Sequence, residues 1–319
     1  MNKQQLIDAL TLYVNGEHEI SAVLYFLLKI EDALVLKKVD VSNELQQKIT
    51  AQFISFVNDK FINNEDLSYL SLSTHDERKN VAYRYDFEQV PEELDFFEEI
   101  NNLDEIETFN FGEDSLDNLF GHITVVGNEE FKLTTFKKHH PIDFVKRDRR
   151  LYVFPSAERF VEMQKDGFII NKGFDLMKVN EDIVVISLKT LEKYFSFDKV
   201  LEVESEEFLE VIEASNFIEN IQELKEYAST NKSYQRKLIS AKSTPVLGMQ
   251  FNSVSAFVAG HPKLKNILKL NDSKTAFNLS SANSKKIFIK LLNDDYLNSD
   301  LTDLNYTANS KDKIEINEE

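Results

Sequence analysis

The side chains best suited to chemistry in this sequence are lysines and arginines in the last third of the chain. Between Tyr227 and Asn293 there are 11 Lys and Arg residues and one acid, Asp272. Neighbouring like charges repel each other, whereas a phosphate backbone supplies the missing counter-charge. The pattern therefore favours a surface that contacts nucleic acid or another polyanion. The candidate contacts are Lys232, Arg236, Lys237, Lys263, Lys265, Lys269, Lys285, Lys286 and Lys290.

A second basic cluster lies earlier in the chain, where Pro141 breaks a predicted strand and favours a loop. Guanidinium groups in such a loop can pair with two phosphate oxygens at once. Salt bridges to the acidic residues 92–117 are the alternative. Neighbouring His139 and His140 point to opposite faces of a strand, which argues against a metal site. The candidate phosphate contacts in this cluster are Lys137, Lys138, Lys146, Arg147, Arg149 and Arg150.

Two other functions stay open on the residues alone. Carboxylates follow the last basic helix, and a Mg²⁺-dependent nuclease needs such groups to converge beside a lysine. Asp at such positions also ends helices and builds turns. A basic face can also bind an acidic protein. The carboxylates in question are Asp294, Asp295, Asp300 and Asp303.

The familiar catalytic and cofactor motifs are missing from the sequence. There is no GxGxxG, GxxxxGK[ST] or HExxH pattern and no cysteine. We assign no catalytic residue, metal or cofactor. Motifs that read base edges are also missing, so contacts to phosphates, which carry no sequence information, are expected.

The first part of the chain has the opposite charge. Residues 1–131 hold 27 Asp and Glu against 9 Lys and Arg, a net charge of −18. This equals the net charge of the whole chain. Acids are densest in 92–117, either as a solvated face or as a surface that docks a basic partner. Glu92, Glu93, Glu98 and Glu99 are the candidate docking residues.

Composition predicts a soluble, folded, cytoplasmic protein. The longest apolar stretch, Ile20–Ile30, has eleven residues and includes Lys29, so it is too short to span a bilayer. The N-terminus lacks the basic start and apolar core of a signal peptide.

Strand patterns precede a run of helical patterns, which predicts an α+β fold with segregated layers. We expect an acidic mixed α/β domain over 1–120, an α+β domain over 121–313 with central antiparallel strands and a basic helical half, and a flexible tail over 314–319. Gly127-Asn128 is the expected turn of a hairpin, and Ser156 the cap of a helix from Ala157. The basic helices are expected at 231–241, 262–270 and 281–293. Lys285, Lys286 and Lys290 are placed on the outer side of the last one.

Three segments resemble the KwaB family, the soluble component of the Kiwa anti-phage defence system. They are HHPIDFVKRDRRLYVFPSAERFVEMQKDGF, KSYQRKL and, most specifically, FIKLLNDDYLNSDLTDLNYTANSKDK, within residues 137–313. The resemblance implies a DNA-binding effector that hinders the replication and expression of phage DNA. It also implies a small membrane partner, KwaA, a location at the inner face of the membrane without insertion, and self-association into a homodimer.

Overall fold

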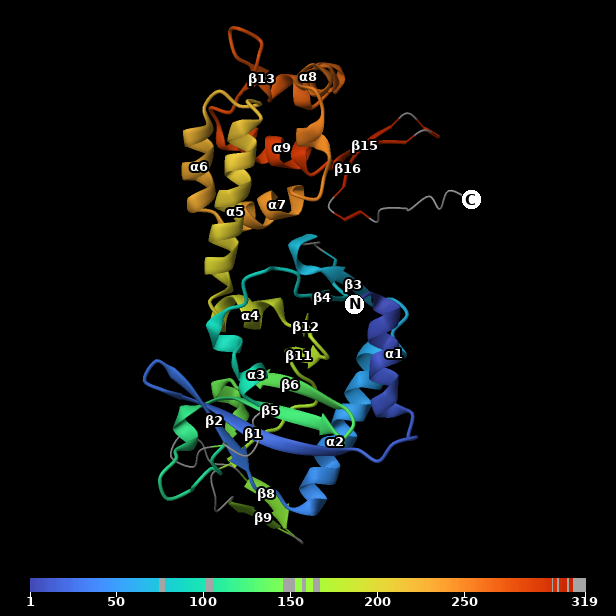
Figure 1. The fold of residues 1–319 in the computed structure, drawn as a ribbon, viewed down its shortest axis with the longest axis vertical. Helices are drawn as coiled ribbons and strands as arrows, with labels where there is room; N and C mark the ends of the chain where they lie inside the picture. The colour runs from blue at the N-terminus through green and yellow to red at the C-terminus, as the bar shows by residue number, and fades with distance from the viewer. Residues whose placement is uncertain are drawn as a thin grey trace. The chain divides into compact units, whose positions relative to one another are not determined.

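The computed structural model describes residues 1–74, 78–100, 106–145, 153–156, 159–162, 167–299, 301–302, 304–308 and 310–311 (Figure 1). Its contacts form two compact units. Unit 1 contains residues 1–69, 82–84 and 92–191, and unit 2 contains 70–81, 85–91 and 192–319. The units therefore divide the chain mainly near residue 191. Residue 120, the expected domain boundary, lies in the second position of strand β5 (Leu119–Gly127) within unit 1.

Unit 1 is built on an eight-stranded sheet in the order β2-β1-β5-β6-β11-β12-β4-β3. Neighbouring strands from β2 to β4 pair antiparallel, as expected for the central strands. Besides β5, the strands are β1 (Ser21–Ile30), β2 (Ala33–Val39), β3 (Ser68–Ser71), β4 (Val81–Arg84), β6 (Lys132–Lys138), β11 (Leu176–Val179) and β12 (Asp182–Val185).

The predicted β5–β6 hairpin is confirmed, and its turn depends on Gly127. This residue has φ +150°, and a Cβ there would lie 2.1 Å from the carbonyl oxygen of Phe131. Asn128 then holds the turn, because its side-chain oxygen accepts the N–H groups of Glu130 and Phe131. Only glycine fits this close approach of two backbones.

Two helices cover one face of the sheet. Helix α1 (Lys3–Val14) is capped by Asn2, and α2 (Asn43–Val57) by Ser42, whose hydroxyl accepts the N–H of Leu45. Helix α2 continues as a π-helical turn to Ile62. Side chains of both helices pack with the β1 residues Leu24, Phe26 and Leu28 into one buried cluster.

The opposite face of the sheet is packed by the acidic segment, which we define as residues 92–100. It contains a short helix, α3 (Phe96–Glu99). Leu94, Phe96, Phe97 and Ile100 are buried, and the Phe96 ring lies 5.3 Å from that of Phe136 on β6. The acids therefore alternate with apolar side chains that fix the segment to unit 1.

The predicted helix from Ala157 is wrong. Residues Val153–Ser156 and Arg159–Glu162 instead form the antiparallel pair β8–β9. Phe160 and Val161 are residue types that favour strands, and this preference outweighs the capping signal of Ser156. A second small pair joins β7 (Phe144–Val145) to β10 (Gly167–Phe168).

Unit 2 is mainly helical, which confirms the expected helical C-terminal part. Its helices follow α4 (Leu188–Tyr194), which spans the boundary, and are α5 (Phe197–Ala214), α6 (Ile221–Ser229), α7 (Lys232–Ala241), α8 (Phe251–Gly260) and α9 (Ala282–Leu292). Its strands form two small hairpins, β13 (Lys269–Leu270) with β14 (Phe277–Asn278), and β15 (Tyr296–Asn298) with β16 (Asn305–Thr307).

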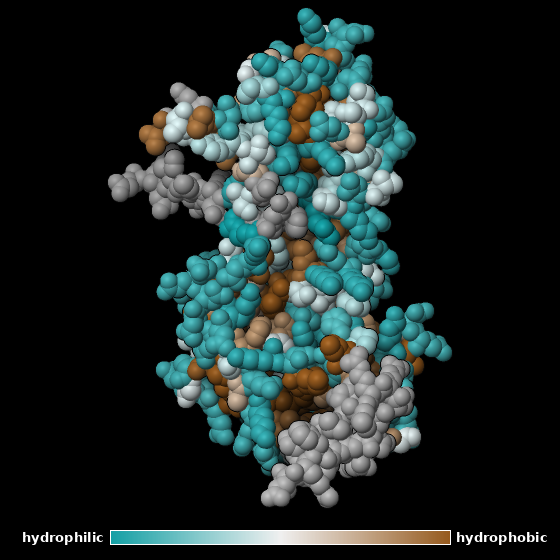
Figure 2. All heavy atoms as spheres, turned by 180° about the vertical axis from the view of Figure 1, so that it is seen from behind, coloured by the Kyte–Doolittle hydropathy of each residue, from teal (hydrophilic) through white to brown (hydrophobic). Residues whose placement is uncertain are grey.

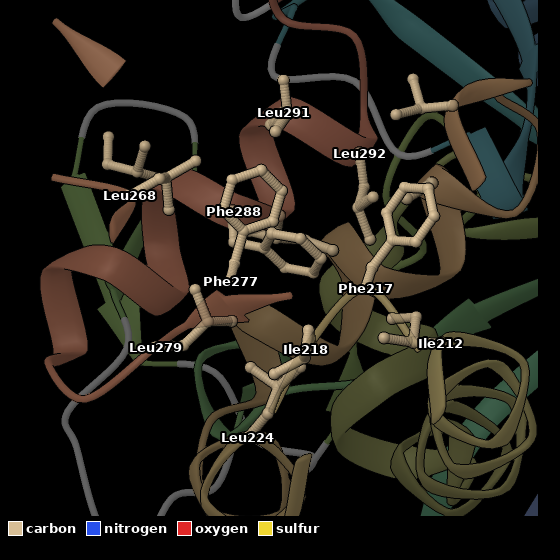
Figure 3. Close-up of a cluster of buried hydrophobic side chains, with 14 of the residues drawn as sticks. Ile212, Phe217, Ile218, Leu224, Leu268, Phe277, Leu279, Phe288, Leu291 and Leu292 are labelled. Carbon is tan, nitrogen blue, oxygen red and sulfur yellow. The ribbon is translucent and has the colours of Figure 1, made fainter. Parts of the chain in front are cut away.

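The core of unit 2 is a cluster of aliphatic and aromatic side chains (Figure 3). Phe277 and Phe288 are completely buried, with ring centroids 6.2 Å apart. Helix α9 contributes a buried stripe formed by Ile287, Phe288, Leu291 and Leu292. Outside these cores, hydrophilic side chains dominate the face shown in Figure 2, with hydrophobic ones visible in patches.

A buried histidine pair lies inside unit 1. His122 Nδ1 on β5 is 2.9 Å from His139 Nε2, and His139 Nδ1 is 3.8 Å from the Asp143 carboxylate. Burial lowers the pKa of His122 to about 3 and that of His139 to about 4. Both rings are therefore neutral at pH 7.

This pair predicts an acid-sensitive unit 1. Each ring binds a proton more readily in the unfolded chain than in the fold, so stability is full above pH 6.5. It falls as the pH drops from 6.5 through about 4 and 3. The expected loss is up to about 2 kcal/mol per histidine between pH 6.5 and 5. Urea unfolding at both pH values measures it. In the variant His122→Gln/His139→Gln this pH dependence should be smaller, and an equal dependence in both proteins would contradict the account.

Candidate nucleic-acid interface

Acids from earlier helices pair with several of the predicted phosphate contacts in unit 2. Lys232 on α7 lies 2.7 Å from Asp198 of α5, and Arg236 pairs with Glu192 of α4. Burial raises the pKa of the Glu192 carboxyl, against the opposing effect of Arg236. The local charge excess between Tyr227 and Asn293 is therefore reduced in the fold, because helices that precede this stretch supply counter-charges.

The prediction that Lys285 lies on the outer side of α9 is wrong. The residue is 7% exposed, and its Nζ is 3.3 Å from Glu223 of α6 and 6.0 Å from the centre of the Tyr227 ring. The next residue, Lys286, is exposed as expected. Adjacent helical residues point about 100° apart. Because Lys285 points toward α6, Lys286 points away from it.

Lys237 and Lys290 are half-buried on α7 and α9. Both contribute to the field at Asp295, a buried carboxylate that lies 3.3 Å from Lys311 Nζ. Burial raises the pKa of Asp295, while Lys311, Lys237 and Lys290 oppose that shift. All three cations therefore act electrostatically on one protein carboxylate.

The carboxylates considered for a nuclease do not converge where the structure describes them. Asp295 is buried and pairs with Lys311. Asp294 is exposed and has a left-handed backbone conformation, φ 57°. Asp300 and Asp303 lie outside the described residues. Among described residues no three His, Asp or Glu side chains group to hold a metal ion.

The second predicted cluster also changes in the fold. Lys138 is 8% exposed, and its Nζ donates to the carbonyl oxygens of Phe120 and His139, so this candidate phosphate contact is buried in the fold. Lys137 pairs with the buried Asp175 at 2.9 Å. The predicted contacts Lys146, Arg147, Arg149 and Arg150 lie outside the described residues.

The exposed positive charge gathers in the lysine segment, which we define as residues 261–274. Lys263, Lys265 and Lys269 are exposed, and none of them pairs with an acid of the described chain. Lys274 joins them at the β13–β14 turn with φ 58°. The sequence pattern does not indicate Lys274, because this lysine lies in a turn and not on a helix face.

The predicted helix over 262–270 is wrong, and the observed turns explain how the lysines are held. His261 Nδ1 accepts the N–H groups of Lys263 and Leu264, and one 3-10 turn follows at Leu264–Asn266. Leu264 and Leu268 are buried in the core of unit 2. The Asn271 side chain then accepts two N–H groups and closes the β13–β14 turn. Polar turn chemistry outweighs the helical pattern here.

The acidic segment presents its predicted docking residues to solvent. Glu92, Glu98 and Glu99 are exposed, and Glu93 is half-buried. Glu98 makes an ion pair of 2.6 Å with Lys178 of β11 while its side chain stays 69% exposed. Such an exposed pair adds little stability and leaves the carboxylate available to a partner.

Comparison with known proteins places these features in a family. The model described as "Kiwa protein KwaB-like" matches residues 116–302. The chain belongs to the KwaB family. It is 29% identical over 289 residues to "Kiwa protein KwaB" of Escherichia coli O55:H7 (strain RM12579 / EPEC), covering 88% of this chain and 90% of that protein. No solved structure matches.

The matched region of this KwaB family member begins three residues before β5 and ends between β15 and β16. It includes the histidine pair, the lysine segment and all of α4 to α9. No helix in the described parts of the chain is long and apolar enough to cross a membrane.

Replacing Asp175 with Ala should destabilise unit 1 by about 3 kcal/mol. The change removes the acceptor of Lys137 Nζ and of the buried N–H of Lys138, both at 2.9 Å. Glu129→Ala, at an exposed turn position, is the control and should stay within about 0.5 kcal/mol of wild type. Urea unfolding followed by circular dichroism measures both. Equal stabilities would show that the Asp175 contacts are unimportant.

Proposed function

We propose that this protein is the DNA-binding effector of a Kiwa anti-phage defence system and binds DNA through the lysine segment. The family membership supports the defence role. The observation that carries the DNA contact is a run of exposed lysines, Lys263, Lys265, Lys269 and Lys274, with one acid, Asp272, among them. Lys286 lies outside this segment but is also exposed.

The chemistry of these contacts favours binding without sequence specificity. A lysine ammonium is a compact point charge that pairs with any phosphate, whereas base reading uses planar groups such as Arg, Asn and Gln in a groove. The acids of unit 1 repel DNA and so favour approach to the lysine segment. Blocking the progress of replication and transcription along bound phage DNA requires no bond cleavage.

Reversing the charge at Lys263, Lys265 and Lys269 to Glu should weaken binding to a labelled duplex at least about tenfold. The plot of log affinity against log salt should also become shallower by about 0.9 for every phosphate that the variant no longer neutralises. Fluorescence polarisation over a salt series measures both. The control variant Lys29→Glu/Lys193→Glu/Lys199→Glu makes the same change in net charge at exposed positions elsewhere and should bind nearly as wild type.

The same titration separates the alternatives. Equally weakened binding in both triple variants would mean that net charge, not the lysine segment, governs binding. Mg²⁺-dependent cleavage of the duplex on a denaturing gel would favour the nuclease. Absence of binding at low salt would favour a module whose basic face binds an acidic protein.

We further propose that the acidic segment docks on KwaA-like membrane subunits at the inner face of the membrane. Cytoplasmic loops of membrane proteins carry an excess of Lys and Arg, which complements Glu92, Glu93, Glu98 and Glu99. The apolar side chains behind these acids already pack on the sheet, so the segment offers charge on a fixed support. We also propose that the protein self-associates into a homodimer.

Changing Glu92, Glu93, Glu98 and Glu99 to Lys should abolish co-purification with the membrane subunit, because attraction becomes repulsion. The matched control changes four exposed acids outside the segment, Glu17, Glu129, Glu206 and Glu210. It should co-purify as wild type does. If the first variant still co-purifies, the docking proposal is wrong. Light scattering of the purified wild-type protein tests the homodimer.

A further inference from the structure

Unit 1 contains two neighbouring cavities beside helix α2. The outer cavity has a volume of about 470 Å³ and is lined mostly by apolar side chains, among them Leu45, Phe111, Leu116 and Phe168. The inner cavity, about 30 Å³, is large enough for a water molecule and is lined by His122, Thr124, Thr135 and Asn171 among others. Ile49, Gln52 and Ile170 line both cavities, so the two are neighbours that share these side chains, with mostly apolar residues around the outer cavity and several polar residues around the inner one.

Among the polar residues around the inner cavity is His122, which is 5% exposed. Asp143 is held as an anion: burial opposes ionisation, but the N–H of His140 and the amide of Asn171 donate to its carboxylate and lower its pKa. This anion faces Nδ1 of His139 at 3.8 Å and favours a proton on that nitrogen. His139 Nε2 is then an acceptor.

The tautomer of His122 follows from this order. Because His139 Nε2 accepts, His122 Nδ1 must carry the proton across their 2.9 Å contact. A neutral imidazole has one N–H only, so His122 Nε2 keeps a lone pair. His122 lines the inner cavity, and its Nδ1 is already used, so Nε2 is the ring nitrogen left to face a ligand.

We propose that the two cavities together bind a small molecule with an apolar body and one hydroxyl or N–H donor at its end. The donor bonds to His122 Nε2, and the body fills the outer cavity. Lys48, the one basic residue in the described lining, is paired with Glu44 at 2.6 Å, so the outer cavity does not require a charged ligand. A volume of several hundred Å³, apolar walls and a few converging polar groups are typical of small-molecule sites. The proposal is independent of DNA binding.

Phenol and anisole test the proposal, because both carry the same ring and only phenol has a donor. We expect phenol to saturate one site of the full-length protein and to shift the Nε2 resonance of His122 in spectra of ¹⁵N-histidine-labelled protein. Anisole should bind at least about tenfold more weakly, since it leaves the acceptor unpaired. Equal affinities for the two probes, or no saturable binding of phenol, would overturn the proposal.

Two variants locate the site. Leu45→Trp fills the outer cavity from a position that is 40% exposed and should abolish phenol binding. Leu12→Trp makes the same change at a position of α1 that is 44% exposed and outside the lining, and should leave binding unchanged. Phenol binding that survives Leu45→Trp would also overturn the proposal. His122→Phe, where it folds, should remove the preference for phenol over anisole.

Discussion

The ion pairs that the earlier helices make with later ones decide which positive charges of unit 2 have a counter-charge within the fold. Asp198, Glu192 and Glu223 reach Lys232, Arg236 and Lys285, and Glu204 of α5 also pairs with Lys242. A lysine brought into a helix contact has to keep a partner, because an unpaired buried charge is very costly. Lys285 is such a buried lysine, whereas the Lys232 side chain is 56% exposed, so its pair with Asp198 adds little stability. The exposed cations of unit 2 that have no acidic partner among the described residues gather mostly in the lysine segment, between α7 and α9 in the sequence.

The two proposed interaction surfaces are built on the same principle with opposite charge. In the acidic segment, buried Leu94, Phe96 and Phe97 alternate with glutamates, and in the lysine segment buried Leu264 and Leu268 alternate with lysines. Apolar burial supplies the stability of each segment, so its charges need no partner within the protein. They can therefore bind phosphates or another protein. The histidine pair and its cavity lie in unit 1 and depend on neither surface.

Much of the fold could be predicted from local patterns. The α+β order, the Gly127 hairpin, the Ser42 cap and the buried stripe of α9 follow from rules that act within a few residues. The helices predicted from Ala157 and over 262–270 are wrong, because strand-forming residue types and the His261 and Asn271 turns outweigh weak helical periodicity. The candidate site is harder to predict. Whether Lys285 or Lys286 faces solvent depends on α6, whose Glu223 lies 62 residues from the pairing lysine in sequence. No pattern in one helix contains that information. Lys274 could not be predicted from a helical pattern, because it lies in a turn.

We propose that packing and pairing, not local charge density, select the lysines available to contact DNA. Lysine acetylation with a limiting amount of an N-hydroxysuccinimide ester, read by mass spectrometry with and without duplex DNA, tests it directly. Lys138 and Lys285 should be unreactive in both samples, and Lys263, Lys265, Lys269 and Lys274 should react freely and become protected by DNA. Protection confined to Lys232 and Lys237, or no protection anywhere while DNA is bound, would contradict the account.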